Sequence, residues 1–599
     1  MSGSGGSTCA AGRLGKGRPI NRSVPTRGAP DFSSRAARGE SWLFHPTAGG
    51  ELSVCLIYPN VYSVAMANLG YQAVYRILAE HPRIGCDRAY LQQGVPRRLV
   101  SFEGHRPLSD FDVLAFSISC EADYVNVLSI LAAAGLPLRG EERSRHGRMP
   151  LVVAGGPATF LNPEPLADFV DVFLIGEAEE MVSEFLDVLL GARDYSRRDL
   201  LEAVGGVAGA YVPEHYTPRY GADGRLVAFD HESRGPGRVR RRWLADLNQS
   251  ATTSQILTSD AVFGGMFMVE GGRGCGWGCR FCAAGYVYRP VRYRSEACVR
   301  AGIAEGLKHR TTIGLVGPEM GSLPGVASTC EHVVASGGRP SPSSLKADVI
   351  SERLARALAV GGNRSVTLAP EAGSERMRRV INKNLTEGEI MRAVRWLVSE
   401  GVDRLKLYFM IGLPTERDDD VEAIVDLVER MRVVPRIGRR IRSLTVSVNS
   451  FVPKPSTPLQ WEPMESLGTL QQKLARLRRR LASLPNVVVE AQSPREAYYQ
   501  TALSRGDRRV GIILEAIHRR RGAWWAVLQE FRHAGGASRC VPSPDFYVHR
   551  AYDPGEMVPW GFIDHGIDTR FLLAERRKAF AGSETPPCDV ATCRSCRLC

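Results

Sequence analysis

The chain has 599 residues, of which 44% are hydrophobic and 24% are charged, so its composition is that of a globular protein and excludes a disordered or collagen-like one. No uninterrupted apolar run approaches the roughly 20 residues of a membrane-spanning helix, and no apolar signal-peptide core is present, so we expect a cytoplasmic protein without a membrane partner. Lys and Arg total 77 against 64 Asp and Glu, a formal net charge of +13. At roughly 100 to 200 residues per domain, the length predicts about three or four domains.

The first segment, residues 1–42, is rich in Gly, Ser and Arg and shows no hydrophobic periodicity. Such a composition cannot bury enough apolar surface to fold, so we expect a disordered basic tail. A solvated tail is the plain interpretation. An RNA or ribosome contact and an organellar transit peptide are alternatives that fit the same composition.

Residues 43–195 alternate short apolar runs with amphipathic segments, the pattern of a doubly wound, Rossmann-like α/β domain. The runs predict strands at 53–58, 113–119, 151–154 and 172–175, and helices that include 66–79 and 124–134. The third and fourth strands end in the turns Gly155-Gly156 and Gly176-Glu177. Ligands bind in loops at the carboxyl ends of parallel strands, so these four residues are candidate contacts, although tight turns alone would explain the glycines.

Residues 196–262 have a mixed composition and predict a linker with a small β element. In residues 263–465, six strand–helix units follow in order, with strands expected at 266–270, 313–316, 344–347, 366–369, 404–410 and 444–448. This order predicts a partial (β/α)6 barrel of the TIM type, with its active site at the carboxyl ends of the strands. We expect a helical region at 466–550 and a Cys-rich tail at 551–599.

Three cysteines lie in one loop directly after the first barrel strand, in the spacing Cys275-x3-Cys279-x2-Cys282. Four thiolates would fill a [4Fe–4S] cluster or a structural zinc site, whereas three leave one position open where a ligand can be activated. A zinc knuckle would need a fourth ligand nearby, and no His occurs between His231 and His309. The loop therefore favours an iron–sulfur cluster with one open iron.

This motif, with the aromatic Phe281 before its third cysteine, resembles the signature of the radical SAM superfamily. The resemblance implies that Cys275, Cys279 and Cys282 each bind one iron of a [4Fe–4S] cluster, that the fourth iron chelates S-adenosylmethionine (SAM), and that Phe281 lies near the adenine. It also implies reductive cleavage of SAM to methionine and a 5′-deoxyadenosyl radical, with an electron donor such as flavodoxin or ferredoxin.

Further barrel segments are similar to SAM-contacting elements of that superfamily. Glu371, Gly373 and Ser374 follow the fourth barrel strand and resemble the segment that meets the ribose or amino-acid part of SAM. Gly412 lies in a Gly-Leu-Pro turn similar to one that approaches the adenine. The expected Gly-Gly-Glu segment appears only as Gly-Pro-Glu at 317–319. Ordinary strand-to-helix turns would give the same residues.

An α/β domain ahead of such a barrel resembles the cobalamin-binding domain of B12-dependent radical SAM proteins. The segments containing Gly155-Gly156 and Gly176-Glu177 are similar to its later strand–loop segments, which implies cobalamin contacts there. The Asp-x-His-x-x-Gly motif is absent, so cobalamin would bind without a protein imidazole, and a domain that has lost the cofactor is the alternative. Over about 42–599 the layout is similar to a poorly characterised group of B12-domain radical SAM proteins.

The tail carries a second group of cysteines, Cys588-x4-Cys593-x2-Cys596-x2-Cys599. This spacing suits a second [4Fe–4S] cluster or a zinc ion, and a flexible thiol-rich tail is the alternative.

These patterns predict a radical SAM enzyme that carries out cobalamin-dependent methyl transfer, or a related radical modification, on a substrate that the sequence does not identify. The second hypothesis is methylthiotransferase-like sulfur insertion into RNA or a ribosomal protein, with the tail cluster as sulfur donor. The third is a non-catalytic, metal-stabilised RNA- or ribosome-binding protein. The positive charge and the basic helices after the barrel fit an RNA partner, although charged faces are usually only solvated.

Overall fold

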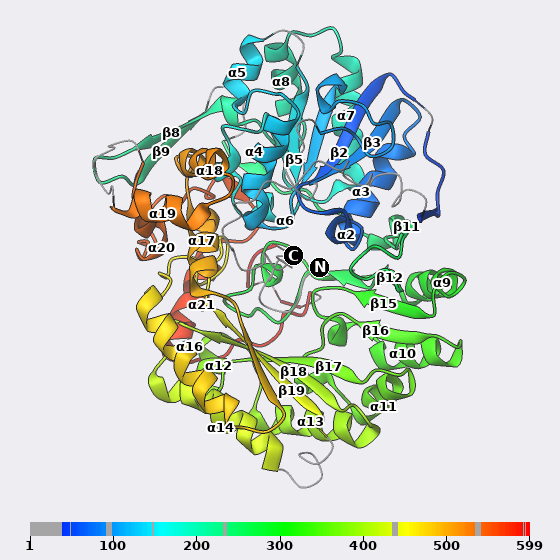
Figure 1. Cartoon of the computed structure of the whole chain (residues 1–599), viewed down its shortest axis with the longest axis vertical. Helices are drawn as coiled ribbons and strands as arrows, with labels where there is room; N and C mark the ends of the chain where they lie inside the picture. The colour runs from blue at the N-terminus through cyan, green and yellow to red at the C-terminus, as the bar shows by residue number, and fades with distance from the viewer. Residues whose placement is uncertain are drawn as a thin grey trace, which may run out of the picture.

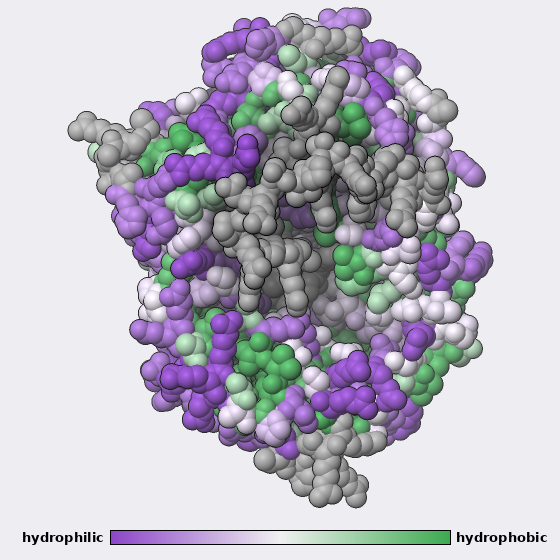
Figure 2. Space-filling view, in the orientation of Figure 1, coloured by the Kyte–Doolittle hydropathy of each residue, from purple (hydrophilic) through white to green (hydrophobic). Residues whose placement is uncertain are grey.

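The chain folds into two α/β lobes in the computed structural model, with the N-terminal lobe at the top of Figure 1 and the larger one below it. The structure describes residues 39–47, 49–91, 99–146, 149–231, 237–433, 441–533, 541–590, 592–593 and 595–598. On the face seen in Figure 2, hydrophilic residues dominate the outer surface of both lobes, and hydrophobic residues form smaller patches between them. Within the described ranges, no helix has both the length and the apolar character needed to cross a bilayer.

A six-stranded sheet forms the centre of the first lobe. Its strands, in spatial order, are β3 (Ile84–Tyr90), β2 (Leu52–Tyr58), β4 (Val113–Ser117), β5 (Leu151–Gly155), β6 (Val172–Leu174) and β7 (Ala210–Tyr211). Only β6 and β7 pair antiparallel. Side chains of β2 alternate between two apolar cores, with Val54 and Leu56 on one face and Cys55 and Ile57 on the other. Both faces are therefore covered, as the predicted doubly wound fold requires.

Helices supply those two cores (Figure 1). α3 (Leu69–Ala79) and α7 (Ala178–Gly191) pack against one face of the sheet, and α4 (Tyr124–Ala133) packs against the other. The helix predicted from residue 66 begins at Leu69 because the Asn68 side chain accepts a hydrogen bond from the Tyr71 backbone N–H at 2.9 Å.

The first lobe extends beyond its predicted limits. Edge strand β3 was not predicted, because its sequence mixes Gly, Asp and Arg with apolar residues. Past residue 195, α8 (Arg197–Gly205) and β7 still belong to this lobe. The predicted small β element in the linker is confirmed as the antiparallel pair β8 (Tyr216–Tyr220) and β9 (Leu226–His231).

The expected disordered tail is wrong for its last residues, and residues 1–38 lie outside the described part of the chain. β1 (Ser41–Trp42) pairs with β11 (Ile256–Leu257). The Glu40 carboxylate accepts a hydrogen bond from Arg88 at 2.7 Å, and both side chains are buried. Residues 39–42 are fixed because a buried guanidinium needs an anionic partner.

The second lobe contains two parallel sheets that together form the incomplete barrel. One has the order β12 (Met266–Glu270), β15 (Thr312–Val316) and β16 (Arg339–Pro342). The other has the order β17 (Ser365–Glu371), β18 (Arg404–Ile411), β19 (Ser443–Ser450) and β20 (Val487–Ala491). The helices α9 (Glu296–Leu307), α10 (Val326–Ala335), α11 (Glu352–Val360), α13 (Glu387–Glu400), α14 (Asp418–Val433) and α16 (Leu467–Ala482) line its outer side in Figure 1.

Two barrel strands differ from the prediction. The strand expected at 344–347 is wrong: β16 lies five residues earlier, at Arg339–Pro342, and contains two prolines. β16 is at the edge of its sheet, where a strand tolerates proline. β20 lies in the region for which only helices were predicted, and it adds a seventh parallel strand beside β19.

The C-terminal segments return to both lobes. α17 (Pro494–Arg505), α18 (Val510–Arg519), α19 (Trp524–His533) and α20 (Pro544–Val548) form a helical group, and α18 packs on α4 of the first lobe (Figure 1). The last helix, α21 (Thr569–Ala581), packs on α12 (Glu375–Val380) of the barrel. The chain end is thereby brought to the region between the lobes.

Candidate functional site

The three cysteines lie in a loop at the carboxyl end of β12, closed at its base by the antiparallel pair β13 (Gly272–Arg273) and β14 (Arg292–Tyr293). The loop folds back closely on itself. Gly274 has a φ of +79°, and a Cβ there would lie 2.5 Å from the Tyr288 carbonyl oxygen. Only glycine fits this position.

Cys279 and Cys282 pack against an apolar wall that includes Phe281, Met410 and Phe451. Burial raises the pKa of Cys279 to about 11, and the nearby Lys383 ammonium opposes that shift. Burial likewise raises the pKa of Cys282, whereas the backbone N–H groups of Ala284 and Gly285 lower it. Thiolates at this site therefore need either bound metal or neighbouring positive charge.

Lys383 and Glu371 form a buried ion pair next to these thiols. The Lys383 Nζ lies 3.3 Å from a Glu371 carboxylate oxygen, and both residues are almost fully buried. Burial raises the pKa of Glu371 to about 7, against the opposing effect of Lys383. Sequence reasoning identified Glu371 but missed Lys383, whose flanking residues Asn382 and Asn384 both have left-handed φ values. An Asn-Lys-Asn turn after a helix is a weak signal, because such turns are common without function.

A second lysine faces the loop. The Lys346 Nζ lies 3.6 Å from the centroid of the Trp277 ring, and Trp277 lies between the first two loop cysteines. The Trp277 indole N–H donates to the Ser322 hydroxyl at 2.9 Å. Glu319 accepts hydrogen bonds from the backbone N–H groups of Gly321 and Ser322. The Glu of the Gly-Pro-Glu segment thus caps a turn.

Other residues predicted to contact SAM have structural partners. Gly373 packs on α14, since a Cβ there would lie 2.2 Å from the Ile424 nitrogen. The Ser374 hydroxyl accepts from the Met377 N–H, which caps α12, and donates to Asp420 at 2.5 Å. At Gly412 a Cβ would lie 2.7 Å from a Leu470 methyl group. These contacts account for the three residues without a ligand, and their role toward SAM stays a prediction.

The Gly-rich turns of the first lobe join it to the rest of the chain. At Gly156, φ is +108° and a Cβ would lie 2.5 Å from the Ile118 carbonyl oxygen. At Gly155 a Cβ would lie 3.5 Å from the Leu174 carbonyl oxygen. At Gly176, φ is +143° and a Cβ would lie 2.4 Å from the Arg242 carbonyl oxygen. At Gly156 and Gly176 the chain's own backbone occupies the space that a Cβ would need, whereas a Cβ at Gly155 would make only an ordinary contact.

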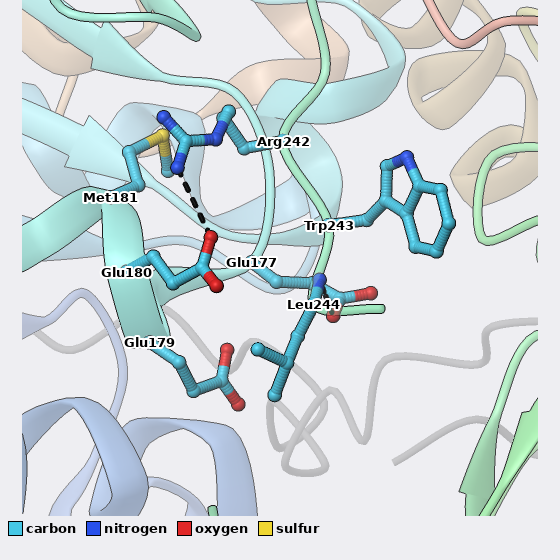
Figure 3. Close-up of a pocket in the computed structure, with 7 residues that line it drawn as sticks. All are labelled: Glu177, Glu179, Glu180, Met181, Arg242, Trp243 and Leu244. Atoms are coloured by element: carbon cyan, nitrogen blue, oxygen red, sulfur yellow. Dashed lines mark hydrogen bonds and ion pairs between the residues drawn. The ribbon is translucent and has the colours of Figure 1, made fainter. Parts of the chain in front are cut away.

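Glu177 is bound by two arginines of the cysteine-loop hairpin. Its carboxylate accepts from Arg292 at 2.7 Å and from Arg273 at 2.9 Å, and also from the Leu244 N–H at 3.0 Å. Burial alone would raise the pKa of Glu177, but the two arginines lower it. Figure 3 shows the adjoining pocket between α7 and the 242–244 segment, which has no internal space large enough for a water molecule. Glu177 is therefore a lobe-joining residue in this structure.

Arg280 ties the cysteine loop to the end of the chain. Its side chain is fully buried and donates to Glu575 of α21 at 3.1 Å and to the Ser583 carbonyl at 2.8 Å. It also donates to the carbonyl groups of Arg379 and Val380 at 3.0 Å each. The residue between two of the loop cysteines is thus a structural anchor.

The tail cysteines lie beside the loop cysteines. The Cys588 N–H donates to the Gly276 carbonyl at 2.7 Å. Cys596 is buried and contacts Arg289, which follows the loop. Cys599 lies outside the described residues.

The loop cysteines fit an iron–sulfur cluster by their donor set, three thiols in one buried loop with Lys383 beside them. Across the described ranges, no three His, Cys, Asp or Glu side chains converge on one point as ligands of a single metal ion do. A cubane cluster does not require such convergence, because its cysteines bind different irons.

Comparison with known proteins agrees with this site. Residues 269–428, which include the loop, match the model of the radical SAM superfamily, and residues 70–213 match that of the N-terminal region of radical SAM proteins. The uncharacterised protein MJ0966 of Methanocaldococcus jannaschii is 28% identical over 467 residues, which cover 77% of this chain and 90% of that protein. This chain therefore belongs to the radical SAM superfamily.

Two solved structures share parts of the fold at low similarity. The cobalamin-dependent SAM radical enzyme OxsB, with aqua-cobalamin and SAM bound, gives a TM-score of 0.47 at 13% identity, over 81% of this chain and 73% of that one. The radical SAM methyltransferase TsrM of Kitasatospora setae, with cobalamin and a [4Fe–4S] cluster bound, gives 0.44 at 14% identity, over 66% of this chain and 72% of that one.

Proposed function

We propose that this protein is an enzyme that cleaves SAM reductively at a [4Fe–4S] cluster bound by Cys275, Cys279 and Cys282. The observation that carries the proposal is the buried three-cysteine loop at the carboxyl edge of the barrel, with Lys383 beside it. When bound, the cluster supplies the electron that cleaves SAM and produces the radical. The radical would then modify a carbon atom of a substrate whose identity is open.

The residues around the loop have distinct roles in this proposal. Phe281, Met410 and Phe451 exclude water from one side of the cysteines. Lys383 adds positive charge beside the thiolates, and with Glu371 it offers one cation and one anion to the carboxylate and amino groups of SAM. Arg280 holds the loop in place through α21.

Cobalamin-dependent methyl transfer is the narrower hypothesis, and the contacts described for the residues predicted to hold cobalamin lie within the chain, so their role toward that group stays a prediction. Gly156 and Gly176 pack closely on the chain's own backbone, and Glu177 is bound by Arg273 and Arg292. No step of the proposed reaction passes through cobalamin.

A second candidate function, sulfur insertion, gains support from the position of the tail. That reaction needs a sulfur donor close to the site where the radical forms, and Cys588 is hydrogen-bonded to the cysteine loop at Gly276. Replacing Cys593 and Cys596 by Ala would then abolish the sulfur-containing product but leave SAM cleavage intact.

The test is anaerobic reconstitution of the full chain with iron and sulfide, followed by addition of SAM and a strong reductant. The wild type is expected to form 5′-deoxyadenosine, and Cys279→Ala is expected to form none. Cys298→Ala, which removes a half-buried cysteine on α9, is the matched control and should behave as the wild type. Equal yields from the wild type and Cys279→Ala would contradict the proposal.

The same assay with methylcobalamin tests the narrower hypothesis. S-adenosylhomocysteine that forms only with methylcobalamin and the intact loop would support methyl transfer. Failure of cobalamin to remain with the protein through gel filtration would exclude it.

A further inference from the structure

Two groups of cysteines, separated by about half of the chain, are brought to the same place. The Cys588 N–H donates to the carbonyl of Gly276, which directly follows Cys275. Consecutive Cα atoms lie 3.8 Å apart and the Cα atoms of paired strands lie about 5 Å apart, so the Cα atoms of Cys275 and Cys588 lie within roughly 9 Å. The tail therefore forms part of the wall of the proposed active site.

A buried cation lies close to both groups. Arg289 is 5% exposed, and its guanidinium lies 3.4 Å from the position that a Cβ of Gly278 would occupy, next to Cys279. Its Nε donates to the Gly285 carbonyl at 2.6 Å. The thiols of Cys596 and Cys588 also lie near this guanidinium, and Cys596 is in hydrogen-bond contact with it.

Arg289 lacks a carboxylate counter-ion in the described part of the chain. Its ring contacts are with Tyr286, at 5.3 Å, and Phe571, at 5.4 Å. A buried charge costs several kcal/mol unless an opposite charge compensates it. Metal-bound thiolates on both sides of Arg289 would supply that negative charge, whereas neutral thiols would not.

We propose that Cys588, Cys593 and Cys596 hold a second iron–sulfur cluster beside the SAM-binding loop, with Arg289 as the cation between the two anionic centres. A single zinc ion held by the same thiols is the alternative, and the metal content of the reconstituted chain distinguishes the two. A cubane spreads its ligands over separate irons. The second cluster goes beyond the proposed SAM cleavage and does not depend on it, whereas the placement of Arg289 between two clusters also rests on the cluster proposed for the loop.

The test is the iron and sulfide content of the full chain after anaerobic reconstitution. The wild type is expected to bind about eight irons. The tail variant C588A/C593A/C596A and the loop variant C275A/C279A/C282A are each expected to bind about four, and Cys298→Ala about eight. A tail variant that retains as much iron as the wild type would overturn the proposal. One zinc per wild-type chain, lost in the tail variant, would overturn it as well.

Thermal unfolding shows whether the triple variant is folded. If it is not, Cys593→Ser changes a half-buried tail position with less disturbance, and it should still remove one of two overlapping EPR signals of the reduced protein. An unchanged spectrum would count against the second cluster. These readouts do not involve SAM, so they separate this inference from the proposed function.

The position of Arg289 has its own test. Removing the cation with Arg289→Gln should shift the reduction potentials of both clusters to more negative values, because each reduced cluster loses a neighbouring positive charge. Arg289→Lys keeps the positive charge, so its reduction potentials should stay close to those of the wild type. Potentials that are the same in wild type and Arg289→Gln would contradict the placement of Arg289 between two clusters.

Discussion

The carboxyl edges of the two parallel regions differ in what their polar groups do. In the first lobe, the edge is bound to other parts of the chain: Glu177 pairs with Arg273 and Arg292. In the barrel, the corresponding edge places Lys383 against the thiols of the cysteine loop. A strand edge of the right topology is thus not enough to define a ligand site. The difference is that Glu177 is enclosed by arginines of the chain, whereas Lys383 has Glu371 as its partner and still faces the cysteine thiols.

The largest expected effect concerns Lys383. Lys383→Met removes the charge beside Cys279, and loss of a group that supports a metal ligand typically costs about 10- to 100-fold in metal affinity or activity. We therefore expect 5′-deoxyadenosine formation to fall by roughly that factor. Lys383→Arg keeps the charge and should retain part of the activity. A Lys383→Met protein with wild-type yield would show that the barrel edge does not depend on this lysine.

The second largest effect is expected at Arg280, which anchors the cysteine loop to α21. Arg280→Ala removes the buried cation beside Glu575, which keeps Lys578 and Thr585, and also removes hydrogen bonds to three carbonyl groups. Breaking a buried ion pair costs about 3–5 kcal/mol of stability. Urea unfolding measures this loss, and limited proteolysis should release the tail. Arg353→Ala is the matched control, because its ion pair with Glu331 is exposed and contributes about 1 kcal/mol or less. Equal effects of the two variants would contradict the anchoring role.

Asp123, at the carboxyl end of β4, gives the first lobe a pH dependence. Burial raises its pKa to about 7 from 3.8, although Asn60 and Asn126 donate hydrogen bonds that oppose the shift. The folded protein therefore holds this proton up to about pH 7, and the stability that it contributes is complete below about pH 4 and lost as the pH rises to 7. The free energy of unfolding falls by about 4 kcal/mol over this pH range. Asp123→Asn should remove this decline.

Melting temperatures of wild type and Asp123→Asn between pH 4 and pH 8 check that expectation. The variant should gain stability relative to the wild type as the pH rises. Parallel curves would show that Asp123 titrates normally in the fold.

The smallest effect is expected at the joint between the lobes. Glu177→Gln weakens its hydrogen bonds to Arg273 and Arg292, which costs about 1–3 kcal/mol of unfolding free energy. SAM cleavage should not change, because these contacts are structural. A loss of activity at unchanged stability would assign Glu177 to a ligand and remove the contrast between the two edges.

Much of the fold was predictable from local patterns. Buried parallel strands such as β5 and β12 are nearly continuous apolar runs, and their predicted bounds are close to the observed ones. β3 and β16 were missed or misplaced because edge strands tolerate the polar residues and prolines that interior strands exclude.

The cysteine loop was predictable because the spacing of its ligands is local. Lys383 and Lys346 were not, because only the fold brings them to Cys279. The same holds for the tail: its cysteines were evident, but their position beside Gly276 depends on a contact between distant segments.

The Arg280–Glu575 pair also determines how late in translation the cysteine loop can be anchored. Its two residues are 295 positions apart, and a ribosome adds about 5–20 residues per second. The cysteine loop therefore leaves the ribosome roughly 15–60 s before its anchor has been synthesised. During that interval the tail does not yet cover the cysteine loop. A cofactor delivered to the nascent chain would therefore reach an open loop, whereas a cofactor delivered to the finished chain would reach a covered one.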